Sequence, residues 1–211
     1  GACHGVAGIL YTLLLFPVEL QAISGGSGMS NVLETIRWLK SLMFESGNLP
    51  SSHPPGRDRL VQWCHGAPGM VHLLCLAARV FPSESESMLR CAQAACDCIW
   101  DRGLLHKGMG LCHGIAGNGY CLLAYANTLK TLAENTGSTT VLDGTPYLEL
   151  SDIYTRRAHA FAEFIILNRS ELERVPDHPY SMFEGMCGAA SLLIDMALRP
   201  GYEAFPGYDF L

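Results

Sequence analysis

The sequence predicts an all-α protein, an α/α toroid built from helical hairpins in two concentric layers. Three observations lead to this fold class. A short glycine motif recurs along the chain, nearly uncharged helical segments alternate with amphipathic ones, and no strand-like alternation of useful length is present. Helices that are apolar all round belong inside a protein, whereas helices with one apolar stripe belong outside. With about four inner helices, the chain would form an incomplete ring.

The recurring motif carries a glycine pair spaced G-x-x-G and runs directly into an apolar stretch. Its copies lie at residues 1–8, 62–69, 110–117 and 183–188. The first three copies place cysteine beside histidine, whereas the fourth has Glu184 in the histidine position. Recurrence of this kind is typical of a repeat architecture whose units share one structural role. Glycines at the helix starts would let the inner ends crowd together and expose backbone N–H groups there.

Helix boundaries follow from apolar periodicity, capping signals and helix breakers. Inner helices are expected over residues 6–16, from 70 to 81, from the third motif copy to about 132, and from the fourth copy to about 198. Amphipathic helices are expected from Asn31 as N-cap to about 43, from a capping box at 83–86 to Gly103, and from Ser151 or Asp152 to about 168. Residues 46–58 and 174–179 are predicted loops, and the polar stretch 133–150 is a predicted surface insertion.

Composition narrows the possible function classes. The 211-residue chain is 49% apolar and carries a net charge of -6 without any basic run, which disfavours nucleic acid as a partner. Several of its nine cysteines sit inside apolar helical patterns, so we expect a reducing compartment. Because no stretch reads as a membrane span or signal peptide, we expect a cytoplasmic location, with at most peripheral contact with the plasma membrane. A motif copy at the first residue, without an initiating methionine, leads us to expect a fragment of a longer protein.

Cys64, Cys112 and His113 are candidate ligands of a zinc ion, because zinc prefers thiolate and imidazole. Three protein ligands would leave a fourth position for a reactant. Adjacent residues point apart along a helix, so Cys112 and His113 could bind one ion only from an irregular turn, which the flanking glycines permit. The alternative interpretation is that the Cys-His pairs are packing residues at helix starts. No short C-x-x-C pair favours a metal, and Cys3 with His4 forms a third pair, so spacing leaves the ligand choice open.

Residues 63–69 (WCHGAPG), 110–114 (GLCHG) and 183–186 (FEGM) resemble the lanthionine synthetase C-like (LanC-like) proteins of eukaryotes, cousins of the bacterial lantibiotic cyclases. The resemblance covers essentially the whole chain, including the Phe-Pro pair near its C-terminus. It implies that residues 1–211 are the C-terminal portion of a single LanC-like domain. The family fold is an α/α toroid of seven hairpins, and its N-terminal part would be absent here.

The resemblance also implies which residues form the zinc site. It selects Cys64, Cys112 and His113 as ligands of one zinc ion and leaves Cys3 without a role. His4 matches the histidine proposed as catalytic acid or base in the bacterial cyclases.

A second set of residues matches positions that contact glutathione in eukaryotic members of the family. This set comprises Lys107, Arg174, Val175, Pro176 and Asp177. Without the resemblance, a solvated lysine and a salt-bridged loop would be the default interpretation.

The activity implied is zinc-dependent addition of the glutathione thiol to dehydroamino acid residues in proteins or peptides, which gives a thioether. The partners would then be glutathione and a protein or peptide that contains dehydroamino acids. The alternative is a non-catalytic signalling scaffold that binds zinc and glutathione. Carbohydrate chemistry is a weaker idea that rests on fold analogy, because α/α toroids also include glycosidases. The paired carboxylates that glycoside cleavage needs are not evident, although the fourth motif copy supplies Glu184.

Overall fold

The computed structural model describes residues 1–136, 140–198 and 205–208. In chain order the helices are α1 (Val6–Leu14), α2 (Pro17–Ala22), α3 (Gly28–Ser41), α4 (Ala67–Val80), α5 (Ser85–Arg102), α6 (Ile115–Thr136), α7 (Tyr147–Leu167), α8 (Arg169–Leu172) and α9 (Met186–Leu198). Two short 3-10 turns, η1 (Ile23–Gly26) and η2 (Pro82–Glu84), precede α3 and α5. Two short strands, β1 (Val141–Leu142) and β2 (Thr145–Pro146), form a small antiparallel hairpin.

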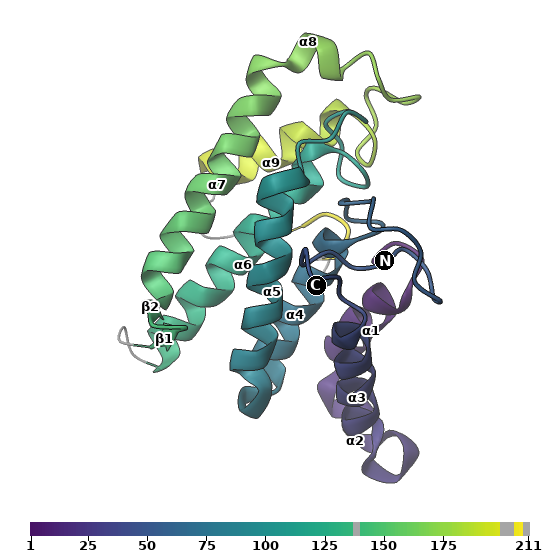
Figure 1. Cartoon of the computed structure of the whole chain (residues 1–211), viewed down its shortest axis with the longest axis vertical. Coiled ribbons are helices and arrows are strands. Elements are labelled where there is room, and N and C mark those ends of the chain that lie inside the picture. The colour runs from purple at the N-terminus through teal and green to yellow at the C-terminus, as the bar shows by residue number, and fades with distance from the viewer. Residues whose placement is uncertain (137–139, 199–204, 209–211) are drawn as a thin grey trace.

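The helices form two layers, which confirms the predicted all-α class and the incomplete ring (Figure 1). Helices α1, α4, α6 and α9 each follow one motif copy and pack against one another in that order. Helices α3, α5 and α7 pack on the outside, against α1, α4 and α6 respectively. The chain therefore runs as successive hairpins of one inner and one outer helix.

Burial explains why each helix lies in its layer. Every residue of α4 from Ala67 to Ala78 is buried, as its nearly uncharged sequence predicts. The outer helices bury only one stripe: Val32, Ile36 and Leu39 on α3, and Met88, Ala92, Ala95 and Ile99 on α5. Both stripes are the predicted ones. Burying a single Ile or Met side chain contributes about 1.5–3 kcal/mol, so these stripes hold the outer layer in place.

The predicted N-caps of α3 and α5 are wrong. Helix α3 begins at Gly28, so Asn31 lies inside it, and its carbonyl oxygen accepts a hydrogen bond from the Thr35 hydroxyl. The earlier start follows from a close approach, because a Cβ on Gly28 would lie 2.1 Å from the carbonyl oxygen of Leu20. The predicted capping box at 83–86 does not form. Helix α5 instead begins at Ser85, so that Glu86 pairs with Arg90, and the Glu84 side chain pairs with Arg37 of α3.

The polar stretch 133–150 is more ordered than predicted. Its described residues complete α6, form the β1–β2 hairpin and begin α7 at Tyr147, and residues 137–139 lie outside the described part. Asp143 and Gly144 both have positive φ angles, 49° and 83°, which two-residue hairpin turns require. Helix α7 starts before Ser151 because Tyr147 and Leu150 are buried.

The glycine motif has one structural role in all four copies. If the second glycine carried a Cβ atom, that atom would clash with a carbonyl oxygen of its own motif loop. The distances would be 2.0 Å for Gly8 and Ala2, 2.3 Å for Gly69 and Trp63, 1.9 Å for Gly117 and Leu111, and 2.3 Å for Gly188 and Met182. Each motif loop therefore folds back onto the first turn of its inner helix, at a distance that only glycine allows.

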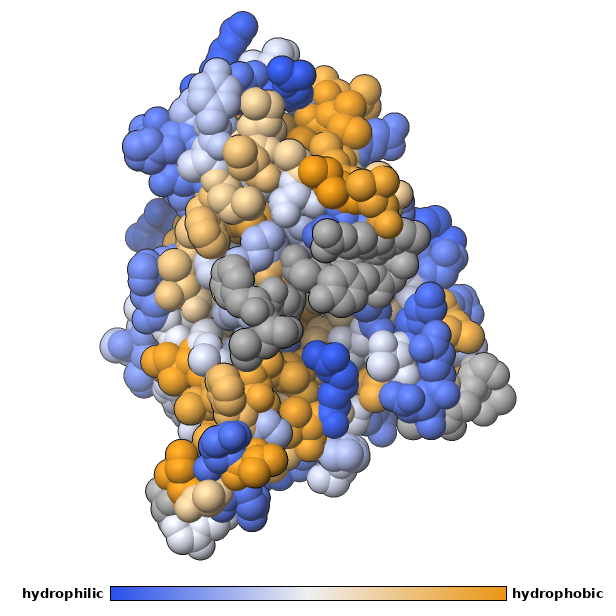
Figure 2. Space-filling view, turned by 180° about the vertical axis from the view of Figure 1, so that it is seen from behind, coloured by the Kyte–Doolittle hydropathy of each residue, from blue (hydrophilic) through white to orange (hydrophobic). Residues whose placement is uncertain are grey.

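The two ends of the inner row expose large apolar side chains, as expected of an incomplete ring. Figure 2 shows one apolar patch over α1 and α2 and another over the region of α7 and α9. The exposed residues are Ile9, Leu13, Phe16 and Val18 at one end, and Ile166, Leu167, Ile194 and Leu198 at the other. Among the helices described, none is both long and apolar enough to cross a membrane. Peripheral membrane contact stays a prediction.

The glycine contact leads to a stability prediction. Gly117→Ala in the complete protein should lower the free energy of unfolding by about 1–3 kcal/mol, because the new methyl group would overlap the Leu111 carbonyl. Gly56→Ala is the matched control, since no atom lies within 4 Å of its added Cβ, and it should change stability by less than about 0.5 kcal/mol. Urea unfolding of both variants measures the difference. Equal stabilities would contradict the role assigned to the motif glycines.

Candidate metal and thiol site

The four motif loops lie in a row at one end of the inner helices and are joined through their backbones. The Cys64 N–H donates to the carbonyl oxygen of Cys112 at 3.0 Å. The Cys112 N–H donates in turn to the carbonyl oxygen of Phe183 at 2.8 Å. The first loop joins the row through Gly1, whose Cβ would lie 1.8 Å from the Cys64 carbonyl oxygen. Segments far apart in sequence thus place their side chains at one centre.

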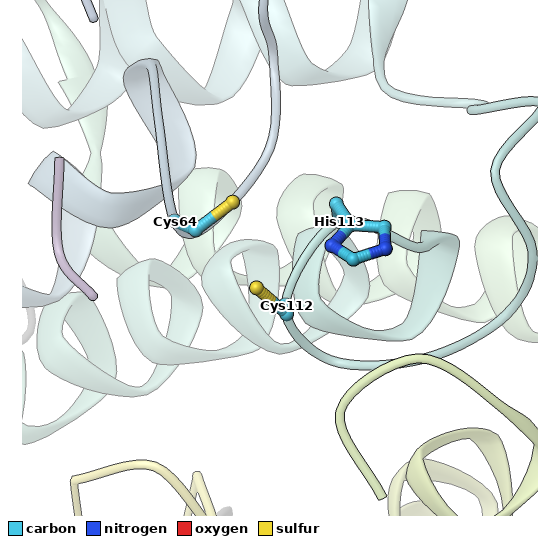
Figure 3. Close-up of side chains that lie close together, drawn as sticks. All are labelled: Cys64, Cys112 and His113. Carbon is cyan, nitrogen blue, oxygen red and sulfur yellow. The ribbon is translucent and has the colours of Figure 1, made fainter. Parts of the chain in front are cut away.

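Cys64, Cys112 and His113 meet at this centre. One ligand atom from each lies within 4.8 Å of the other two (Figure 3). Cys112 and His113 belong to the turn before α6, which begins at Ile115, so adjacent residues can face the same point. Cys64 comes from the separate loop before α4 and is 5% exposed, whereas the other two are half-buried. The structure thus brings the predicted trio together, and their role as ligands stays a prediction.

The pKa values of the Cys64 and Cys112 thiols are shifted in opposite directions. The Cys112 thiol donates a hydrogen bond to the Cys64 sulfur, and His65 and Gln62 also contact that sulfur. These contacts outweigh burial and lower the pKa of Cys64 to about 5. The same hydrogen bond raises the pKa of Cys112 far above its ordinary value, because ionisation would break the bond and place a second charge beside Cys64. Of the two thiols, Cys64 is therefore the one that ionises more readily.

This donor set fits zinc. Two sulfur atoms and an imidazole nitrogen are the ligand types that zinc prefers, and three of them leave one coordination position open. Donor atoms bound to one zinc ion lie roughly 3.3–3.8 Å apart, so a trio within 4.8 Å needs only a small contraction. A divalent cation would also stabilise both thiolates.

The residues that hold the Cys64 loop in place were not predicted from the sequence. The Gln62 side-chain amide donates to the Cys64 sulfur at 3.1 Å. Asn48 is fully buried, and its side-chain oxygen accepts a hydrogen bond from the Ala67 N–H at the start of α4, at 2.7 Å. The Asn48 side-chain NH₂ donates to Leu60 O and to Asp58. The position of Gln62 next to the motif was an available signal, whereas Asn48 had none in its Ser-, Pro- and Gly-rich loop.

Asp58 anchors the same loop to α5. Its carboxylate accepts hydrogen bonds from Ser46, from Asn48 and, through both oxygens, from Arg102 at 2.9 and 3.0 Å. Partial burial opposes ionisation, but these hydrogen bonds and the Arg102 charge outweigh it. They hold the pKa of Asp58 below its ordinary value.

His4 lies in the exposed first motif loop. Its Nε2 atom is 3.3 Å from the sulfur of Cys3. Both residues line an open groove of about 540 Å³, together with Thr12, Trp63 and Tyr208. His4 therefore borders a space large enough for part of a peptide, and its catalytic role stays a prediction.

The predicted glutathione residues lie on two exposed segments that touch each other. A Cβ on Gly108 would lie 3.2 Å from the Pro176 ring, so the turn that contains Lys107 packs against the loop 174–177. Lys107, Arg174, Val175 and Asp177 are exposed. In the described part of the chain, neither Lys107 nor Arg174 forms an ion pair. Both cations are thus available to an anionic ligand, and their binding role stays a prediction.

The chain is similar to proteins of a known family over almost its whole length. The model of the family described as "Lanthionine synthetase C-like protein" matches residues 1–210. LanC-like protein GCL1 of Arabidopsis thaliana is 36% identical over 214 residues, which cover 99% of this chain and 43% of that protein. Glutathione S-transferase LANCL1 of Danio rerio is 34% identical over 212 residues, which cover 99% of this chain and 45% of that protein. The chain therefore spans less than half the length of these two relatives.

The Asp58 network leads to a pH-dependent prediction. Because the folded pKa of Asp58 lies below the unfolded value of about 4, its contribution to stability is present above that pH and is lost as the pH falls through the folded pKa. Asp58→Asn should therefore be less stable than the wild type at pH 7, and its stability should fall less steeply below pH 4. Urea unfolding across a pH series measures this.

Asp152→Asn is the control at pH 7, because it removes a carboxylate from an exposed pair with Arg156. It should change stability by less than about 1 kcal/mol. Parallel pH profiles for the wild type and Asp58→Asn would contradict the role assigned to the Asp58 network.

Proposed function

Because the chain belongs to the lanthionine synthetase C-like family, we propose that it adds the glutathione thiol to dehydroamino acid residues in proteins or peptides. The observation that carries the proposal is the trio of Cys64, Cys112 and His113, which would hold one zinc ion. The printed name of the Danio rerio relative, a glutathione S-transferase, supports glutathione as the thiol. Since this chain spans less than half of that relative, the activity is proposed for the complete protein.

The reaction needs a thiolate and a proton donor. A bound zinc ion supplies the first by keeping a coordinated thiol ionised at neutral pH, well below the ordinary thiol pKa of about 8.5. A sulfur–carbon bond then forms at the β-carbon of the dehydroamino acid, and the electrons of its double bond move toward the α-carbon. That carbon must gain a proton to complete the thioether product. We assign this proton transfer to His4, which lies in the groove beside the trio.

Glutathione carries two carboxylates and one ammonium group, so its recognition calls for charges of both signs. Lys107 and Arg174 would bind the carboxylates, and the planar guanidinium of Arg174 can bind one of them through two hydrogen bonds. Asp177 would accept the ammonium group. Val175 and Pro176 lie between these charged residues in sequence and would contact the peptide backbone of the ligand.

The metal part of the proposal has its own test. In the complete protein, Cys112→Ala should reduce bound zinc at least tenfold, because two donors from the chain hold the ion much less tightly than three. Cys187→Ala removes an exposed cysteine of the fourth motif copy and should leave the zinc content unchanged. Elemental analysis of the purified variants gives the result. Equal zinc in the wild type and Cys112→Ala would overturn this site.

The catalytic part is tested by turnover of a dehydroalanine peptide with glutathione. His4→Gln should keep its zinc yet form thioether about 10²–10⁴-fold more slowly, the usual range for loss of a general acid. His159→Gln, which changes an exposed histidine on α7, should retain the wild-type rate. Mass spectrometry of the peptide measures the product. A wild-type protein that binds glutathione but forms no thioether would instead be the non-catalytic scaffold.

A further inference from the structure

A third cysteine lies beside the trio. The Cys3 sulfur contacts the Nε2 atom of His4 at 3.3 Å, and the sulfur atoms of Cys112 and Cys64 are near enough to influence it electrostatically. Cys3 is exposed and borders the groove that also contains His4. The proposed reaction assigns no role to this residue.

The backbone holds Cys3 in this position. Gly1 lies against the Cys64 carbonyl oxygen, where a Cβ atom would approach to 1.8 Å. Ala2 is 5% exposed and packs against Gly69 at the start of α4, where an added Cβ would lie 2.8 Å from the Ala2 Cβ. Gly8 of α1 fixes Ala2 from the other side. Cys3 is therefore anchored through its neighbours to the same loop that carries Cys64.

The chemistry of the site favours Cys3 as a further ligand of the metal. Cys64, Cys112 and His113 leave one tetrahedral position of zinc open, and thiolate is among its preferred ligands. The exposed Cys3 side chain borders the groove, so its sulfur can turn between the trio and solvent. We propose that Cys3 is a fourth, exchangeable thiolate ligand of the metal that the trio holds, an inference that rests on the metal site of the proposed function.

With Cys3 bound to the metal, a thiol substrate would reach the metal by exchange with Cys3. The incoming thiol must displace Cys3 rather than occupy an open position. Its proton passes to the Cys3 sulfur, so the exchange releases no net proton. The His4 Nε2 atom, 3.3 Å from the Cys3 sulfur, is placed to relay that proton. Cys3 thus protects the site from other ligands until a thiol arrives.

Cobalt substitution counts the thiolate ligands directly. In the complete protein loaded with Co²⁺, the sulfur-to-cobalt charge-transfer absorption per bound ion rises with the number of coordinated thiolates. Cys3→Ala should lower this absorption by about one third, from three thiolates to two. Cys187→Ala is the matched control and should leave it unchanged. Equal absorption in the wild type and Cys3→Ala would overturn the inference.

Glutathione titration provides a second measurement. In the wild type, glutathione replaces Cys3 and the absorption should stay constant, whereas in Cys3→Ala it should rise to the wild-type level. An equal rise in both proteins would show that the fourth position was open from the start and would overturn the inference. Failure of the proposed metal site looks different, because Cys112→Ala would then retain the full cobalt absorption.

Discussion

The structure depends on one close contact, the approach of a glycine in the first turn of each inner helix to a carbonyl oxygen of the preceding loop. Gly8, Gly69, Gly117 and Gly188 all make it, and a Cβ atom at any of them would overlap that oxygen. The contact presses each loop onto its own helix, so that neighbouring loops come within backbone hydrogen-bonding distance when the helices pack. The row of loops is thus a consequence of helix packing and glycine together.

This backbone arrangement explains why the chemistry gathers at one end of the helices. The bond from the Cys64 N–H to the Cys112 carbonyl sets the two cysteines side by side. Their sulfur atoms then lie close together, and a divalent cation bound there would stabilise both as thiolates. The groove that contains His4 and the exposed cations Lys107 and Arg174 lie on segments next to this centre.

The long loop before α4 is a structural part of the site. Asn48 ties it to the helix start, Asp58 ties it to Arg102 of α5, and Gln62 contacts the Cys64 sulfur. A buried asparagine with all its hydrogen bonds satisfied gives such a loop one conformation. The position of Cys64 is thereby determined by residues outside the motif copies as well as within them.

Local sequence pattern was sufficient to predict which helices lie in the inner layer and which lie in the outer layer. The stripes of α3 and α5 and the uniform burial of α4 follow from the spacing of apolar residues within single helices, which the sequence contains directly. Local sequence pattern was insufficient to predict the helix caps and the connections between helices. Glu84 pairs with Arg37 of another helix, and the Asp143–Gly144 turn was overlooked.

The candidate site, like the fold, could be predicted only in part from the sequence. The Cys-His pairs and their glycines are visible in the sequence, so the chain by itself determined which residue types were available for a metal. The family resemblance selected Cys64, Cys112 and His113, but only the tertiary structure shows that they meet and that Cys3 lies beside them. The physical reason is that hydrogen bonds between separate loops set these distances, and no local sequence pattern encodes a contact between segments so far apart in the chain.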